Sequence, residues 1–598
     1  MTKLIKYLKP HIPFIFLAIV VLFIQAFCDL SLPNIMAQLV NMILRNINEG
    51  HEGTGLTDSG VLALGLRMLA ITLTGGSAAV GVSFLFNRIA AGVSRDLRFA
   101  VFKKVESFSS REFDDFSTAS LITRCTNDVS NVQGVFSVGL RMIFYAPIMG
   151  FGGVFMAIRM ASSMSWIIVV AVIVLMGMIG LIISIVMPKF KIIQDLFDRM
   201  NRLARETLGG LMVIRAFSAQ EHDKERFERV NGELVKTNLF VNRIMNLQMP
   251  VSQLIMNISI LIIIWNGAHR IAAFSMEVGD MMAFIQYTMQ IIFAFQFLSM
   301  IFVMLPRASV SGERIAQVLE KDESIKDPAN PLSFPIAPNA GSNAGAGSSL
   351  KQGLRVEFKN VSFRYEGAEN LAISKINFTA EEGKTTAIIG ATGSGKSTIA
   401  SLILRFYDLT EGTILMDGVD IRQVSQNDLR SRIGYVPQKS ILLSGSVSYN
   451  LRYGKINAPD EEIIEGAEIA QARDFIEGMS EGMESSISQG GANISGGQKQ
   501  RLSIARALIR EPELLIFDDS FSALDFATDS RLRAALAEKK KGITKIVIAQ
   551  RVGTIMQAEK IIVLERGHIV GVGTHEELID TCDEYREIAE SQLEGAAS

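Results

Sequence analysis

Long apolar runs dominate the first half of the sequence and limit what it can fold into. Six of them are long enough to cross a bilayer, since a helix of about 20 apolar residues spans the ~30 Å hydrocarbon layer. They lie at residues 13–41, 60–88, 135–158, 164–188, 246–273 and 279–306. Composition agrees, because 48% of the residues are hydrophobic, 20% are charged and the mean hydropathy is +0.29. The sequence predicts an α-helical membrane domain at residues 1–320.

Basic residues are unevenly distributed among the segments that flank these runs. The N-terminal segment and the long polar segments 89–134 and 189–245 are rich in Lys and Arg, whereas each of the three shorter connections carries at most one. The positive-inside rule therefore predicts that both termini and both long polar segments are cytoplasmic. The short external loops and the missing eukaryotic targeting features indicate a bacterial plasma (inner) membrane. Both polar segments keep helical periodicity, which predicts helices that continue beyond the membrane.

Three ionisable residues fall inside the apolar runs: Asp29, Arg67 and Arg141. Because charge is costly in hydrocarbon, these side chains are expected to face the interior of the bundle or water. Two interpretations stay open. These side chains either pair between helices or snorkel to the interface, or they contact a transported substrate directly.

Charge and cysteine usage exclude several classes of protein. The net charge of -2 gives no electrostatic reason to expect a nucleic-acid partner. The three cysteines, Cys28, Cys125 and Cys582, are far apart and form no CxxC pair, which excludes a disulfide scaffold or a typical zinc site.

The second half of the chain has a different organisation. Residues 321–352 are predicted to form a flexible linker, because they contain the run NAGSNAGAGSS, which cannot build a core. From residue 353 to residue 598, strand and helix patterns alternate with ordinary charge, which predicts an α/β domain.

A phosphate-binding motif opens this second domain. Residues 385–398 read TTAIIGATGSGKST, which is G-x-x-x-x-G-K-[ST] between a strand and a helix, the context that the motif requires. Backbone N–H groups and the helix N-terminus are expected to surround phosphate oxygens, with Lys396 on the β- and γ-phosphates and Ser397 on Mg²⁺. The candidate nucleotide contacts in this loop are Gly390, Ala391, Thr392, Gly393, Ser394, Gly395, Lys396, Ser397 and Thr398.

Two further motifs follow the loop. The apolar run ELLIFD ends in Asp518, a strand-end carboxylate suited to holding Mg²⁺. Between them, Ser495, Gly496 and Gly497 open a helical pattern, which taken alone is compatible with a helix cap and a tight turn.

This ordered set of motifs resembles the ATP-binding cassette (ABC) family. The set comprises Gly390–Thr398, Gln438, the run Ile494–Gln498, Asp518 and the run Ser522–Asp525. Six membrane runs ahead of one cassette resemble a half-transporter of the ABC exporter family. The resemblance implies a P-loop NTPase cassette with a helical subdomain, ATP and Mg²⁺ as ligands, and a dimer that encloses two ATP molecules.

The resemblance also implies roles for individual residues. Tyr365 fits the aromatic residue that stacks on adenine, and Gln438 fits the residue that senses Mg²⁺ and the attacking water. The implied metal ligands are Ser397, Gln438 and Asp518. Asp525 ends a loop that crosses the dimer interface. Segments near 110–116 and 211–217 fall where the family places helices that dock on cassettes. The signature that caps the partner's ATP comprises Ile494, Ser495, Gly496, Gly497 and Gln498.

Two residues depart from the family pattern. Asp519 stands where the family usually has a Glu general base, and Gln550 stands where it usually has His. Asp is one methylene shorter, a displacement of ~1 Å that costs about 10²-fold in rate, and Gln has no imidazolium charge. The site is therefore expected to bind ATP well and to hydrolyse it slowly, with Asp519, Gln438 and Gln550 as its catalytic positions.

The intact signature beside this impaired site predicts a heterodimer. Its partner would be a second half-transporter with Glu and His at the positions of Asp519 and Gln550. The predicted function is ATP-driven export of amphipathic drugs or lipids, as in a multidrug-type bacterial exporter. The alternative is an ATP-gated channel or regulatory subunit that does not pump.

Overall fold

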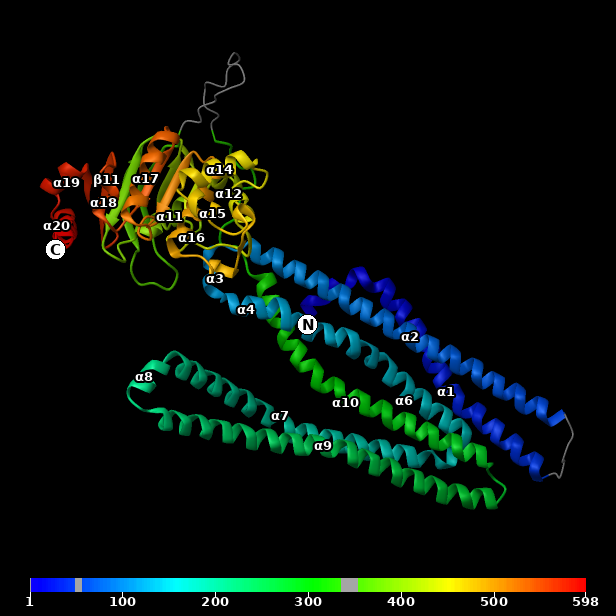
Figure 1. Cartoon of the computed structure of the whole chain (residues 1–598). Helices are drawn as coiled ribbons and strands as arrows, with labels where there is room; N and C mark the ends of the chain where they lie inside the picture. The colour runs from blue at the N-terminus through cyan, green and yellow to red at the C-terminus, as the bar shows by residue number, and fades with distance from the viewer. Residues whose placement is uncertain (1, 49–55, 335–352, 598) are drawn as a thin grey trace, which may run out of the picture. The chain divides into compact units, whose positions relative to one another are not determined.

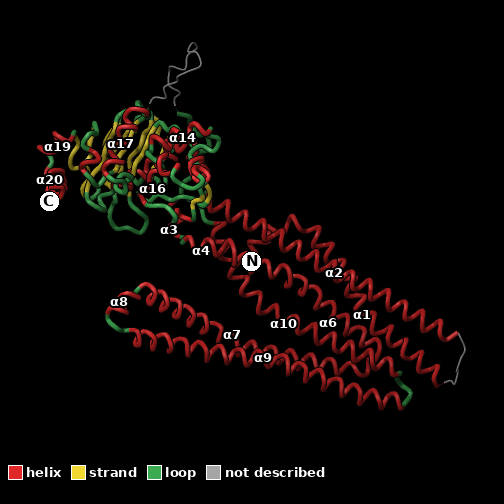
Figure 2. Tube along the Cα trace, in the orientation of Figure 1, coloured by secondary structure: helices red, strands yellow, loops and turns green. Residues whose placement is uncertain are grey.

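The computed structural model describes residues 2–48, 56–334 and 353–597, and the chain divides into two compact units (Figure 1). The helical unit comprises Met1–Glu106 and Thr118–Lys321, and the α/β unit comprises Ser107–Ser117 and Asp322–Ser598. Strands occur only in the α/β unit among the described residues (Figure 2).

The helical unit is built from long helices. A 3-10 segment, Thr2–His11, leads into the first of them. The long helices are α1 (Ile12–Asn48), α2 (Leu56–Glu106), α6 (Leu140–Ala161), α7 (Ser165–Gly209), α9 (Gln220–Ala272) and α10 (Val278–Glu320). Helix α6 is preceded by α4 (Thr118–Thr123), a π-helical turn (Arg124–Asp128), α5 (Val129–Gly134) and a second π-helical turn (Val135–Gly139). The short helix α8 (Leu211–Ala216) joins α7 to α9.

Five segments of the described residues are long and apolar enough to cross a membrane, so the predicted number of six is not confirmed. They are Lys6–Arg45, Ser59–Glu106, Thr118–Gly209, Gln220–Ala272 and Val278–Leu298. The third segment, of 92 residues, contains two predicted runs, 135–158 and 164–188. They are counted together because only a 3-10 turn, Ser162–Met164, separates α6 from α7.

Buried apolar side chains hold the long helices together. Helices α7 and α9 pack through Val186, Ile193, Leu196, Leu234 and Val241, and these residues recur at helical spacing on each helix. Helices α1, α6 and α10 share a second cluster, in which α6 approaches α10 closely. A Cβ at Gly153 would lie 2.7 Å from Cγ1 of Ile291, so this crossing needs glycine.

The α/β unit contains two main sheets. The six-stranded sheet has the order β12-β11-β3-β10-β9-β6, parallel except for β12, and the four-stranded antiparallel sheet has the order β2-β1-β4-β5. The strands of the first are β12 (His568–Gly573), β11 (Lys560–Glu565), β3 (Thr385–Gly390), β10 (Thr544–Ile548), β9 (Leu514–Asp518) and β6 (Ile433–Val436). Those of the second are β2 (Ile373–Ala380), β1 (Val356–Phe363), β4 (Glu411–Met416) and β5 (Val419–Asp420). The short strands β7 (Gly445–Ser446) and β8 (Ser486–Ile487) pair antiparallel.

Side chains on both faces of the six-stranded sheet are buried. Ala387 and Ile389 of β3 belong to one hydrophobic cluster, whereas Ile388 belongs to another. All five residues of β9 are buried as well. Burial on both faces explains why these strands are continuous apolar runs in the sequence.

Ten α-helices of the α/β unit begin at or after the end of the glycine-rich loop in the described part of the chain. They are α11 (Lys396–Ile403), α12 (Gln426–Ser431), α13 (Val447–Arg452), α14 (Asp460–Ile469), α15 (Arg473–Glu477), α16 (Gly496–Ile509), α17 (Phe526–Lys539), α18 (Val552–Ile555), α19 (His575–Thr581) and α20 (Asp583–Ala597).

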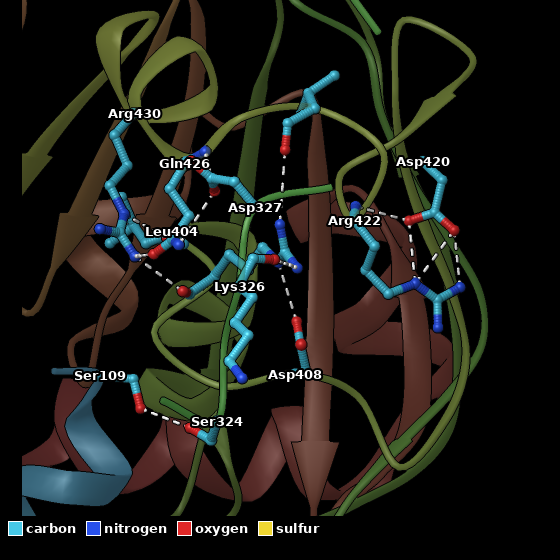
Figure 3. Close-up of polar contacts among 12 residues, drawn as sticks. Ser109, Ser324, Lys326, Asp327, Leu404, Asp408, Asp420, Arg422, Gln426 and Arg430 are labelled. Carbon is cyan, nitrogen blue, oxygen red and sulfur yellow. Dashed lines mark hydrogen bonds and ion pairs between the residues drawn. The ribbon is translucent and has the colours of Figure 1, made fainter. Parts of the chain in front are cut away.

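The first part of the predicted linker is packed against the α/β unit. Asp327 accepts hydrogen bonds from the backbone and side-chain nitrogens of Gln426, at 3.0 and 3.1 Å (Figure 3). Phe334 is buried, and the guanidinium carbon of Arg432 lies 4.7 Å from the centre of its ring. Residues 322–334 therefore belong to this unit, and the rest of the predicted linker, 335–352, lies outside the described residues.

Helix α3 (Ser110–Asp115), on a segment distant in sequence, joins the same surface. Glu112 is buried, and its carboxylate accepts the backbone N–H groups of Ser109 at 2.8 Å and Ser324 at 3.1 Å. Burial would raise the pKa of Glu112, but hydrogen bonds from these two serines outweigh it and lower the pKa below its ordinary value. Tyr407 also donates to Asp114 at 3.1 Å. Helices α3 and α8 both form where the family resemblance placed docking helices.

Replacement of Phe334 by Ala should destabilise the α/β unit. Truncating a buried Phe costs about 3–5 kcal/mol, and for a unit of this size each kcal/mol lowers Tm by about 2–4 °C. We expect Phe334→Ala to lower the Tm at which the α/β unit unfolds in calorimetry. The control is Leu332→Ala, because Leu332 is 51% exposed two residues away. An equal decrease in Tm for both variants would contradict the packing of residues 322–334 against the α/β unit.

Candidate nucleotide-binding site

The glycine-rich loop leaves β3 and leads into α11 with a backbone that requires glycine. Gly395 has φ +99°, and a Cβ there would lie 2.8 Å from the carbonyl oxygen of Ala372. Gly393 has φ +83°. These angles turn the chain tightly enough to start α11 at Lys396, directly after the loop.

Lys396 lies at the centre of this loop. Its Nζ donates to the carbonyl oxygens of Gly390 at 2.7 Å and Ala391 at 2.8 Å. Burial lowers the pKa of Lys396, and the nearby Asp519 and Asp518 carboxylates oppose that shift. The ammonium group is thus held where the loop can present it to a phosphate.

Ser397 and Asp518 form the candidate Mg²⁺ site. The Ser397 hydroxyl donates to Oδ1 of Asp518 at 2.9 Å, and the Tyr435 hydroxyl lies 3.5 Å from Oδ2. Burial raises the pKa of Asp518, which the hydrogen bond from Ser397 opposes. A hydroxyl and a carboxylate are the hard oxygen ligands that Mg²⁺ takes together with substrate phosphates. The described residues contain no cluster of three or more His, Cys, Asp and Glu that could hold a metal without such a substrate.

One cavity of about 310 Å³ brings most of the predicted residues together. Its lining comprises Tyr365, Ala372, Thr392, Gly393, Gly395, Lys396, Ser397, Thr398, Gln438, Asp518, Asp519, Ile548 and Gln550. The Tyr365 hydroxyl lies 3.1 Å from Oγ1 of Thr398, which fixes the ring at the cavity wall. Ser394 is buried beside the cavity, and its hydroxyl has no hydrogen-bond partner among the described residues. These donors and oxygen ligands fit a Mg²⁺–nucleoside triphosphate, whose phosphate charge the metal neutralises when bound.

Asp519 has a constrained backbone and an occupied carboxylate. Its φ is +46°, and its N–H donates to the carbonyl oxygen of Ile548 at 2.8 Å. Its Oδ2 accepts from Nε2 of Gln438 at 3.2 Å and from Nε2 of Gln550 at 3.0 Å. The three residues predicted as catalytic positions therefore meet at a single carboxylate oxygen.

The signature residues lie elsewhere in the α/β unit. Ser495 caps α16: its hydroxyl accepts the N–H of Gln498 at 3.3 Å, and Oε1 of Gln498 accepts the N–H of Ser495 at 2.9 Å. Ser495 and Gly496 are exposed. Asp525 likewise caps α17, accepting the N–H of Thr528 at 2.9 Å. The helix cap predicted from the sequence is therefore present. Ile494–Gln498 and Asp525 do not line the cavity, and the N-terminal end of α16 is exposed to solvent in the single chain.

Gln592 supports the segment that carries Gln550, and sequence reasoning missed it. Its Nε2 donates to the carbonyl oxygen of Gln550 at 2.7 Å, and its Oε1 accepts the N–H of Val552 at 2.8 Å. Arg533 holds the same segment, since its Nη1 donates to the carbonyl oxygen of Gly553 at 3.2 Å. No motif marks Gln592, which is 42 residues beyond Gln550 in the C-terminal helix α20.

Fold and site together define a half-transporter, with an N-terminal membrane domain followed by an ATP-binding cassette. The family description "ABC transporter transmembrane region" matches residues 15–295, and "ABC transporter" matches residues 373–522. The chain belongs to the ABC transporter family.

Relatives and solved structures agree over nearly the whole chain. An uncharacterised ABC transporter ATP-binding protein of Mycobacterium tuberculosis (strain CDC 1551 / Oshkosh) is 38% identical, covering 98% of this chain and 97% of the relative. The ATP-dependent lipid A-core flippase of Pseudomonas aeruginosa is 30% identical, covering 96% of this chain and 93% of the relative. The ATP-bound structure of a bacterial Atm1-family ABC exporter has a TM-score of 0.77 at 23% identity, covering 97% of this chain and 98% of that one. The chain thus has the fold of such an exporter, as predicted, and is a multi-pass membrane protein.

Loss of the Gln592 side chain should loosen the segment that carries Gln550. Leaving the N–H of the buried Val552 without its partner costs about 1–3 kcal/mol, which corresponds to about 5- to 150-fold faster opening. We expect Gln592→Leu to speed hydrogen exchange at the Val552 amide by such a factor in mass spectrometry. The same change at exposed Gln557 is the matched control. Unchanged exchange at Val552 would show that α20 does not hold the segment.

Proposed function

We propose that the chain is the degenerate-site subunit of a heterodimeric ABC exporter, which moves amphipathic drugs or lipids out of the cytoplasm. The observation that carries the proposal is the Asp519 carboxylate, which accepts from the Gln438 and Gln550 amides where the family has Glu and His. The proposal includes the orientation from the positive-inside rule, with the cassette and both termini in the cytoplasm of a bacterium.

Tight ATP binding is supported by the lining of the cavity. The loop N–H groups and Lys396 supply donors for the phosphates, Ser397 and Asp518 supply oxygen ligands for Mg²⁺, and Tyr365 supplies a flat surface for adenine. None of these groups departs from the family pattern. The nucleotide is therefore bound by a complete set of contacts.

Slow hydrolysis is supported by the two departures. A general base must lie within ~2.6–3.2 Å of the water that it deprotonates, and Asp519 is one methylene short of the usual Glu. Two amide donors, from Gln438 and Gln550, already occupy Oδ2 of Asp519, so a water molecule has to compete with them for that oxygen. Gln550 can donate a hydrogen bond to the γ-phosphate but cannot carry a positive charge.

The exposed N-terminal end of α16 supports the proposal that a second half-transporter binds this chain. Ser495 and Gly496 are solvent-exposed at a helix N-terminus, where N–H groups and the helix dipole favour a phosphate. In the single chain this end lies outside the cavity, so it is suited to the ATP held by a second cassette. A partner with Glu and His at the positions of Asp519 and Gln550 would make that second site the competent one.

The first test restores the two side chains. In a complex whose partner lacks its catalytic Glu, Asp519→Glu should raise the residual ATPase rate in part. Asp519→Glu with Gln550→His should raise it by about 10²-fold, more than the product of the single effects, because residues that act as one unit are not additive. A flat rate for the double variant, or robust turnover by the unmodified chain alone, would contradict the degenerate-site proposal.

The second test compares the two sites in the intact complex. Ser495→Arg should abolish turnover, because a bulky cation blocks closure over the partner's nucleotide. Lys396→Ala should have a smaller effect, because it disables a site that is already slow. ATP turnover measures both variants, and Lys499→Arg is the control on the same helix. Greater damage by Lys396→Ala would reverse the assignment of the two sites.

A further inference from the structure

A second cavity in the α/β unit lies between the six-stranded sheet and α17. It has a volume of about 290 Å³, and its wall includes Val547 of β10, Phe517 of β9 and Leu536 of α17. Helix α17 covers this face of the sheet, since Leu532 and Leu536 share a hydrophobic cluster with residues of both strands (Figure 1). Among the described residues, none lines both this cavity and the nucleotide site.

The polar part of this lining lies near the amino ends of the parallel strands. Thr385 is the first residue of β3, Lys545 is the second of β10, and Glu559 directly precedes β11. The nucleotide site lies at the opposite, carboxyl ends of the same strands. The cavity is therefore a separate candidate site, whose ligand would not contact the nucleotide.

Two lysines of the lining, Lys541 and Lys545, have ammonium groups without a partner. Among the described residues, neither ammonium forms an ion pair or donates a hydrogen bond. Lys545 lies on the same face of β10 as the buried Val547, because alternate residues of a strand point to one side. Burial lowers the pKa of Lys545, and the Glu559 carboxylate opposes that shift. A half-buried cation without a partner is costly, so an anion in the cavity would stabilise it.

The remaining charges of the lining limit the charge of such an anion. Arg533 is already paired, since its Nη2 lies 2.9 Å from Oδ2 of Asp529. Glu559 contributes one negative charge, and its carboxylate accepts the N–H of Thr385 at 2.8 Å. One positive charge therefore remains from the two unpaired lysines, which favours a ligand with a single negative charge.

Much of the cavity wall is apolar, and part of it is aromatic. The rings of Phe517 and Phe521 are buried with their centres 5.0 Å apart, and Ile555 and Ala558 continue the apolar surface. Aromatic rings stabilise one another beyond the area that they bury. The wall therefore favours a ligand whose apolar part is a ring system.

We propose that this cavity binds a small aromatic carboxylate. The carboxylate lies against Lys545 and Lys541, and the ring lies against Phe517 and Phe521. The volume is at the lower end for small-molecule sites, which suits a compact ligand. The proposal is independent of the proposed export function, because it uses no residue of the nucleotide site.

The first experiment measures binding of naphthoate to the full-length chain in phosphatidylcholine nanodiscs by ligand-observed NMR, with empty nanodiscs as the reference. Its carboxyl group has a pKa near ~4, so it is charged at pH 7. Lys545→Met should weaken naphthoate binding at least tenfold, because it removes a charge-assisted contact. Naphthamide, which has the same rings and no charge, should bind the variant and the unmodified chain alike. Equal losses for both ligands, or no loss for naphthoate, would overturn the proposal.

Lys539→Met is the matched control for this variant. Lys539 is exposed at the end of α17, its Nζ pairs with Glu468 at 3.0 Å, and it does not line the cavity. The control changes the net charge of the chain equally, so it should retain naphthoate binding. A tenfold loss in the control would show that the effect comes from overall charge and would overturn the assignment to Lys545.

A second pair of variants tests the location without removing a charge. Ala537 is exposed and lines the cavity, whereas Ala534 is exposed on the same helix and does not. Ala537→Phe should fill the cavity and weaken naphthoate and naphthamide at least tenfold, and Ala534→Phe should retain both. Retention of both ligands by Ala537→Phe would overturn this location.

A third ligand tests the aromatic contact. Decahydronaphthoate has the same charge and saturated rings, so it should bind the unmodified chain several-fold more weakly than naphthoate. Equal or tighter binding of the saturated acid would overturn the aromatic class of the ligand. Since no measurement here uses ATP, failure leaves the degenerate-site proposal intact, and ATP turnover tests that one separately.

Discussion

Parallel pairing of four strands is the constraint on which the nucleotide site depends. In β3, β10, β9 and β6 the carboxyl ends meet at one edge of the sheet, and ligands bind at such edges. In this register Ile548 stands beside both Ile388 and Asp518. The loop after β3, Gln550 after β10, Asp519 after β9 and Gln438 after β6 therefore open into one cavity, although up to 160 residues separate them along the chain.

Sequence reasoning could predict this site because its residues sit in local patterns. Lys396 and Ser397 follow glycines that only a phosphate-binding turn explains, and Asp518 ends an apolar strand. It could also predict Ser495 as a helix cap, since the cap depends on residues within one turn. Apolar length predicted the membrane helices, but it did not predict that a three-residue turn, Ser162–Met164, is all that separates α6 from α7.

The residues that sequence could not place are held by contacts between distant segments. Gln592 contacts Gln550 from a C-terminal helix whose composition is ordinary. In the sequence Phe334 lies in what looks like a polar linker, and only the structure shows that Arg432 packs over its ring. The surroundings of Asp29 are similar: its position within an apolar run is visible in the sequence, whereas Tyr145 and Gln290 join it only through packing of three helices. Periodicity reports which face of a helix is buried, but not which helix it meets.

The membership of helix α3 in the α/β unit has a consequence for biosynthesis. The chain passes between the two units three times, at residues 106/107, 117/118 and 321/322. Ribosomes add about 5–20 residues per second, so Glu112 leaves the ribosome on the order of ten seconds or more before Ser324, its hydrogen-bond donor. The interval between synthesis of the two partners is longer still for Arg111 with Glu366 and for Asp114 with Tyr407. Residues 322–598 therefore do not contain the whole α/β unit. After they are synthesised, they still have to bind helix α3, which was made earlier, between two membrane segments.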